Sequence, residues 1–172
     1  MIGHPPTQAQ KEIITQQLGR EPRGLISVAV ATPEGVPVVL QMASMVDGQP
    51  FPTLYWLSSK DVYQAIAEIE TSGEVKRLEQ ALLDDESFLN EHLADQERYV
   101  ALRDKQMSAA VRAEIEQRGF EDLFKTYGIG GIRQWDKIRC LHMNYAYHLV
   151  HSTAVGRRLE QAFDLAKLTI TK

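Results

Sequence analysis

Apolar and polar residues follow two different periods along the chain, and these periods separate strand-like from helix-like segments. Between residues 25 and 57, short runs rich in Val, Ile, Leu and aromatic side chains alternate with turn residues, which is typical of β-strands. The runs cover residues 25–32, 38–45 and 54–57, with turns at 33–37 and 47–48. We predict a β-hairpin followed by a third strand.

The other segments carry apolar residues at helical spacing. Residues 7–18 form one such pattern, and a second begins after Ser59, a predicted N-cap. Further helices are predicted over residues 74–83, 84–107 and 108–117, of which the middle segment is one helix or two. Because no repeat, low-complexity tract or long linker interrupts the chain, we predict one domain over residues 1–172. We assign it to the α+β class, with a small three-stranded antiparallel sheet near the N-terminus packed against several helices.

Length and composition exclude several classes of protein. A chain of 172 residues with 44% hydrophobic residues can bury a sizeable core, and its single cysteine excludes disulfide scaffolds and zinc fingers. No apolar run approaches the roughly 20 residues needed to cross a bilayer, and no secretory signal is recognisable. We therefore expect a cytoplasmic protein without a membrane partner. The net charge of −4 argues against general nucleic-acid binding, and a homo-oligomer is left open.

Charge is distributed unevenly between the middle and the end of the chain. Residues 59–120 carry 14 acidic and eight basic side chains, whereas residues 121–172 carry five and eight. The acidic middle is typical of a solvated helical face. Alternatively, the segment 84–107 belongs to a helical protein-interaction module, which would expose an apolar stripe through Phe88, Leu93 and Val100.

A glycine-rich loop precedes the basic end of the chain and is our first candidate site. Gly128, Gly130 and Gly131 stand before residues 132–151, which we predict to be helical, and the first amides of a helix attract anions. Cationic side chains follow the loop or lie in the turn before the first strand: Arg133, Lys137, Arg139, Arg20 and Arg23. We expect these glycines and cations to bind a small ligand that bears phosphate or carboxylate. The other interpretation is a flexible connector followed by a solvated basic helix.

Cys140 and His142 are the candidates for catalysis, as in a hydrolase-like enzyme that uses them in a cleft. A thiol nucleophile needs a neighbouring base, and on a regular helix His142 points away, so the pair requires a bend or an irregular helix start. The alternative is a small buried cysteine and a hydrogen-bonded core histidine. His148 and His151, at i, i+3 spacing, are weak metal candidates, but two ligands are not a site, so we predict no metal ion and leave the cofactor unknown.

Four separated motifs resemble the bacterial family catalogued as domain of unknown function 501. They are QLGREPRG at 17–24, PFPTLYWLS at 50–58, the glycine loop, and CLH at 140–142. The resemblance runs from about residue 17 to 156 and implies a compact cytoplasmic bacterial protein, with no established activity to carry over. In some bacteria the family is encoded near a septum-formation protein and an exopolyphosphatase.

The family motifs imply one shared site and also mark two departures. The motif positions fall on Arg20, Arg23, Pro50, Phe51, Pro52, Gly130, Gly131, Cys140 and His142, which we expect to line or support one site. The resemblance implies that many relatives carry a cysteine where this chain has Thr32 and a histidine where it has Tyr147. These departures weaken a metal or disulfide interpretation for this chain and leave anion binding unaffected.

Overall fold

A three-stranded antiparallel sheet lies at the centre of the computed structural model, which describes residues 3–172. Its strands are β1 (Leu25–Ala31), β2 (Pro37–Met42) and β5 (Tyr55–Leu57), in the order β1-β2-β5. The central strand β2 is buried along its whole length. The predicted hairpin, the third strand and the α+β class are therefore confirmed.

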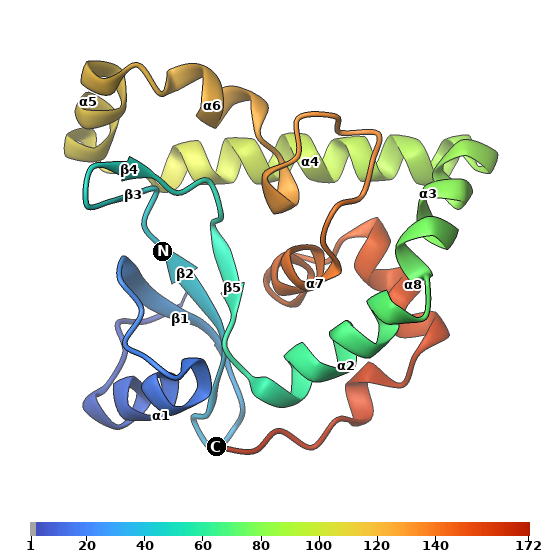
Figure 1. Cartoon of the computed structure of the whole chain (residues 1–172), viewed down its shortest axis with the longest axis horizontal. Helices are drawn as coiled ribbons and strands as arrows, with labels where there is room; N and C mark the ends of the chain where they lie inside the picture. The colour runs from blue at the N-terminus through green and yellow to red at the C-terminus, as the bar shows by residue number, and fades with distance from the viewer. Residues whose placement is uncertain (1–2) are drawn as a thin grey trace.

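Helices cover both faces of this sheet (Figure 1). Helix α1 (Gln8–Leu18), which begins with a capping box at Thr7, packs Ile14 on Leu40 and Met42. Side chains alternate between the two faces of a strand, so Val39 enters the main core on the opposite face. That core is built with α2 (Lys60–Thr71), α7 (Leu141–Val150) and α8 (Ala154–Ala162).

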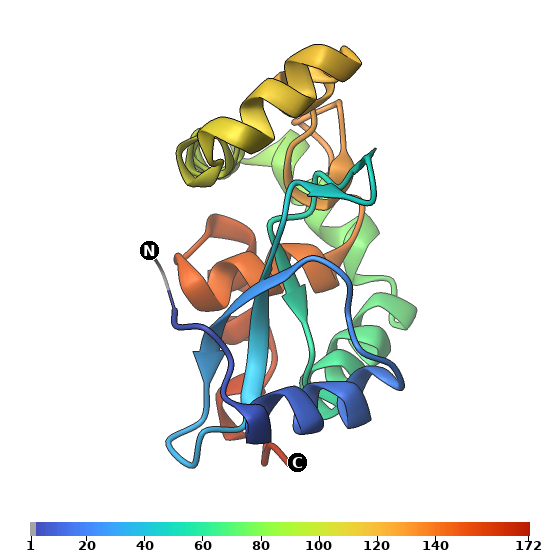
Figure 2. The same cartoon turned by 90° about the vertical axis from the view of Figure 1, so that its left-hand side faces the viewer.

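The remaining helices extend the molecule away from the sheet (Figures 1 and 2). They are α3 (Glu74–Asp84), α4 (Glu86–Gln106), α5 (Ala109–Arg118) and α6 (Glu121–Thr126), with the hairpin β3 (Met45–Val46) and β4 (Gln49–Pro50) beside them. The segment predicted as one helix or two is a single helix, α4, because Asp85 caps its first turn and no residue interrupts it. Among residues 3–172, no helix has both the length and the apolar character that crossing a membrane requires.

A buried arginine holds the long helix α4 against two distant loops. The guanidinium of Arg103 donates hydrogen bonds to the carbonyl oxygens of Pro52, Phe124 and Tyr127, at 2.8, 2.5 and 2.7 Å. It also lies over the ring of Tyr99, whose hydroxyl accepts from the N–H of Leu54. Arg103 thereby fixes the segment that leads into the glycine-rich loop.

Candidate functional site

The segment predicted as a helix over residues 132–151 is helical only in its second half. Residues 127–140 form a loop with one short 3₁₀ turn, Ile129–Gly131, and α7 begins at Leu141 with Cys140 as its N-cap. Gly130 and Gly131 both have positive φ, 75° and 69°, which turns the chain out of a helical path. The predicted helix start at residue 132 is therefore wrong by nine residues.

Side chains from earlier helices hold this loop in place. Gln96 Oε1 accepts a hydrogen bond from the N–H of Ile129 at 2.7 Å, and Glu79 Oε1 accepts one from the N–H of Ile138 at 3.1 Å. These long-range bonds satisfy backbone groups that a continuous helix would have paired locally. The irregular path is thus a consequence of packing against α3 and α4.

The glycines of the predicted anion site do not stand at a helix N-terminus. The N–H of Gly131 is bonded to the carbonyl of Gly128 at 3.0 Å. At the actual start of α7, the N–H of Leu141 donates to Glu70 Oε1 at 2.6 Å. The anion at this helix terminus is therefore a carboxylate of the protein itself, and the predicted cradle of glycine amides on a helix start is not formed.

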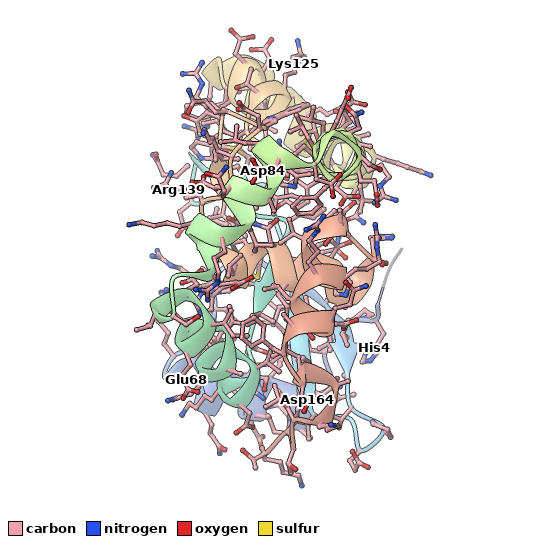
Figure 3. The ribbon with its side chains drawn as sticks, turned by 90° about the vertical axis from the view of Figure 1, so that its right-hand side faces the viewer. His4, Glu68, Asp84, Lys125, Arg139 and Asp164 are labelled. Carbon is pink, nitrogen blue, oxygen red and sulfur yellow. The ribbon has the colours of Figure 1, made fainter. Side chains whose placement is uncertain are left out.

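The predicted cationic residues fall into two separate groups. Arg133 and Arg139 are exposed and Lys137 is half-buried, all in the loop before α7, and none has an ion pair among residues 3–172. The guanidinium of Arg133 lies over the ring of Tyr127, and Arg139 is at the surface in Figure 3. Arg23, by contrast, pairs with Asp47 in the β3–β4 turn at 2.7 Å.

Arg20 belongs to the second group by its place in the fold. It follows α1, which lies at the opposite end of the molecule from the loop before α7 (Figures 1 and 2). Among the described residues, no hydrogen bond or ion pair links Arg20 or Arg23 to the loop that carries Arg133, Lys137 and Arg139. The contacts of the described residues therefore give no support for placing Arg20 and Arg23 in one site with the other family motif positions.

Cys140 and His142 come together with a third side chain that the sequence did not indicate, Glu70. Cys140 Sγ lies 3.9 Å from His142 Nδ1, and Glu70 Oε1 lies 3.3 Å from the same nitrogen. The extended backbone at Cys140 (φ −138°, ψ 117°) supplies the irregular helix start that the pair requires. Among the described residues, this is the one group of three or more His, Cys, Asp and Glu side chains whose donor atoms all lie within 4.8 Å of one another.

The surroundings of His142 fix the orientation of its ring. Its Nε2 lies 3.2 Å from the carbonyl oxygen of Tyr63, and the Tyr63 ring packs on the imidazole at a centroid distance of 4.1 Å. Because a carbonyl only accepts, Nε2 carries the proton and Nδ1 faces the thiol and the carboxylate. Burial alone would lower the pKa of His142, but the hydrogen bond with Cys140 and the charge of Glu70 together raise it above its ordinary value.

The site is partly open to solvent. Cys140 is half-buried and Glu70 is 29% exposed, whereas His142 is buried. Gly130 packs beside the cysteine, since a Cβ placed on it would lie 3.6 Å from that of Cys140, while a Cβ on Gly131 would meet nothing within 4 Å. The glycine-rich loop therefore borders the cysteine at Gly130 and is open around Gly131.

The other histidines of α7 do not form a second cluster. His148 Nδ1 accepts from the N–H of Thr153 at 2.9 Å, and its Nε2 lies 3.3 Å from Glu160 Oε1, so both ring nitrogens face partners on the α8 side. His151 is the C-cap of α7, and its Nε2 has no hydrogen-bond partner among the described residues. The i, i+3 pair is not part of the described cluster.

Thr32 and Tyr147, the two positions expected to depart from the family pattern, lie outside the cluster. Thr32 is in the β1–β2 turn, where it lines a cavity beside the C-terminal segment. Tyr147 is buried in the main core and stacks on Tyr55 at 6.0 Å. Neither residue therefore contributes a donor atom beside Cys140.

Comparison with other proteins identifies the family of the chain. No curated protein and no solved structure matches it. The model of a family described as protein of unknown function (DUF501) matches residues 28–161, which include all three residues of the cluster. The match covers most of the chain and agrees with the motifs at 50–58 and 140–142. The chain therefore belongs to the DUF501 family.

Proposed function

We propose that the protein binds one divalent transition-metal ion, zinc by preference, through Glu70, Cys140 and His142. The observation that carries the proposal is the convergence of the three donor atoms. Zinc bonds of about 2.0–2.3 Å in tetrahedral geometry place neighbouring ligand atoms about 3.3–3.8 Å apart. The distance of 3.3 Å between Glu70 Oε1 and His142 Nδ1 falls within that spacing, and the distance of 3.9 Å between Cys140 Sγ and His142 Nδ1 lies just above it.

The tautomer of His142 supports the same function. With Nε2–H directed at the carbonyl of Tyr63, the Nδ1 lone pair faces a carboxylate oxygen and a sulfur atom. Three electron-rich atoms directed at one another require a cation between them, either a proton or a metal ion. Metal-ligating histidines commonly donate their second ring N–H to a backbone carbonyl, as His142 does here.

The donor set favours zinc and leaves a coordination position for chemistry. One thiolate, one imidazole and one carboxylate are ligands that suit zinc. Magnesium and calcium prefer oxygen ligands alone, so this donor set does not favour them. Three protein ligands leave the fourth position for water, and zinc lowers the pKa of such a water to near neutrality. We therefore propose metal-assisted hydrolysis as the reaction class.

The loop cations support a small anion as the ligand or substrate of this site. Arg139 directly precedes Cys140 and is exposed, and Arg133 and Lys137 belong to the same loop. An anion that bears phosphate or carboxylate would meet these side-chain charges together with the metal ion. The anion would thus be held by side chains, in place of the helix-terminal amides that the sequence predicted.

A metal-free thiol enzyme is the second candidate, favoured by the contact between Cys140 and His142. At 3.9 Å the imidazole Nδ1 is within hydrogen-bond reach of the sulfur, and the carbonyl of Tyr63, which accepts from Nε2, orients the ring as the third member of the arrangement. This candidate requires a thiol that is reactive whether or not zinc is present.

One experiment separates the two candidates. The protein is stripped with a chelator and titrated with zinc against a chromophoric competitor, and thiol alkylation is followed in parallel. Because Cys140 is the only cysteine, alkylation reports on this site alone. We expect one zinc per chain and alkylation slowed by zinc, with both effects lost in His142→Ala and kept in the exposed-site control His4→Ala. Rapid alkylation that zinc does not change would favour the thiol enzyme and reject the metal site.

A further inference from the structure

A groove of about 580 Å³ lies between α4, α5 and α6, at the end of the molecule that Figure 3 marks with Lys125. Its floor is apolar and consists of Val100, Ala101, Met107, Ile115, Phe124 and Trp135. Trp135 donates its Nε1–H to the carbonyl of Thr126 at 2.8 Å, which fixes the indole ring in the floor of the groove. Of the apolar stripe expected along residues 84–107, Phe88 is buried in the core and Val100 lines this groove.

The rim of the groove is acidic on both sides. Four carboxylates line it, Glu97 and Asp104 on α4, Glu116 on α5 and Glu121 on α6, against the two cations Arg112 and Lys125. Arg112 is already paired with Asp104 at 2.5 Å. Glu97, Glu116 and Glu121 are exposed and have no ion pair within 4 Å among residues 3–172.

We propose that this groove binds an amphipathic helix of a partner protein, with bulky apolar residues along one stripe and Lys or Arg on both flanks. The complementary ligand must carry an apolar centre between two cationic edges, because carboxylates stand on both walls and apolar side chains lie between them. A basic amphipathic helix has that cross-section and binds grooves through anchors at i, i+3, i+4 and i+7. A small cation would contact only one of the two walls. Trp135 in addition offers an aromatic ring, which attracts Lys or Arg side chains.

The experiment measures binding of a fluorescein-labelled synthetic peptide with a leucine stripe flanked by lysines, by fluorescence anisotropy in about 0.15 M salt. We expect saturable binding, weakened at least about tenfold in the double variant Glu97→Lys/Glu121→Lys. The matched control is Glu12→Lys/Glu68→Lys, which changes the net charge equally on exposed positions of α1 and α2, away from the groove. The control should bind within about twofold of the natural chain.

A neutral variant tests the apolar floor separately from charge. Val100→Ser should weaken binding several-fold without changing the net charge, because it removes apolar surface from the contact. Circular dichroism and the melting temperature confirm that each variant is folded. Equal losses in the two double variants would mean general charge attraction and would overturn the proposal. Absence of saturable binding, or binding that a short lysine analogue displaces as well as the peptide, would overturn it too.

Discussion

The carboxylate of Glu70 accepts a hydrogen bond at 2.6 Å from the backbone N–H of Leu141, at the start of α7. The same oxygen lies 3.3 Å from His142 Nδ1. The positive end of the α7 dipole therefore lies against this carboxylate. Glu70 therefore joins α2 to α7 and presents a charged oxygen beside the thiol and the imidazole.

Replacement of Glu70 separates its role as a ligand from its role as a helix cap. Glu70→Gln keeps an amide oxygen for the Leu141 N–H but removes the charge, so we expect zinc affinity to fall at least about tenfold. Glu79→Gln is the matched control, because Glu79 also accepts a loop N–H, that of Ile138, and lies outside the cluster. Competition titration with zinc measures both variants. Equal affinities in the two would exclude Glu70 as a ligand.

Gly156 is required by the ring that packs on it. A Cβ at this position would lie 1.9 Å from Cγ of His148, so Gly156→Ala must displace the imidazole from Thr153. We expect the free energy of unfolding to fall by about 1–3 kcal/mol, as for other overpacked cores. Gln161→Ala, at an exposed position of the same helix, should change it by less than about 0.5 kcal/mol. Urea denaturation gives both values, and an unchanged Gly156→Ala protein would contradict the packing described here.

The buried guanidinium of Arg103 should be important for stability. Arg103→Met fills similar space but leaves the carbonyls of Pro52, Phe124 and Tyr127 without this donor. Unpaired buried acceptors cost about 1–3 kcal/mol each, so we expect a total loss of at least about 2 kcal/mol. Lys105→Met, at an exposed position of the same helix, is the control and should be close to neutral. A loss below about 1 kcal/mol in Arg103→Met would show that water satisfies these carbonyls.

His92 should make stability fall in mild acid. Burial lowers the pKa of His92 below its ordinary 6.5, although the carbonyl of Lys137 and the carboxylates of Asp95 and Asp136 oppose the shift. Below pH 6.5 the unfolded chain therefore binds a proton that the native protein resists. The contribution of His92 to the free energy of unfolding is fully present above about pH 6.5 and is lost as the pH falls toward the native pKa. It amounts to about 1.4 kcal/mol per unit by which the pKa is lowered.

The variant His92→Asn isolates this contribution from that of other groups. Unfolding free energies measured between pH 7 and 5 should fall less steeply in His92→Asn than in the natural chain. His4→Asn, at an exposed position, should keep the full slope. Identical slopes in all three proteins would mean that His92 does not couple folding to protons.

Local signals in the sequence predicted the regular elements well. The turn residues at 33–37 and the run at 54–57 located the sheet because strand period and turn chemistry are local properties. Ser59, the predicted N-cap, begins α2 for the same reason, and the helix predicted from residue 108 is α5, which Ser108 caps. The short helix α6 and the helix α8 were not predicted, although Thr153 caps α8 in the same way.

The candidate site depends on contacts that no local pattern contains. The loop before α7 departs from a helix because Gln96 and Glu79, far away in sequence, take its backbone N–H groups. Glu70 lies seventy residues before Cys140, on the last turn of α2. In the sequence it looks like any other glutamate of a solvated helix, because only the fold brings it beside Cys140. The sequence could thus name Cys140 and His142 as a pair that needs an irregular helix start, but not their third partner.

Zinc K-edge X-ray absorption of the zinc-loaded protein tests the central claim most directly, because it reads the atoms bonded to the metal. The account predicts one sulfur at about 2.3 Å and nitrogen or oxygen ligands at about 2.0–2.2 Å, with the sulfur shell lost in Cys140→Ser. A spectrum without a sulfur ligand in the natural chain, or one that Cys140→Ser leaves unchanged, would contradict a metal site at Glu70, Cys140 and His142.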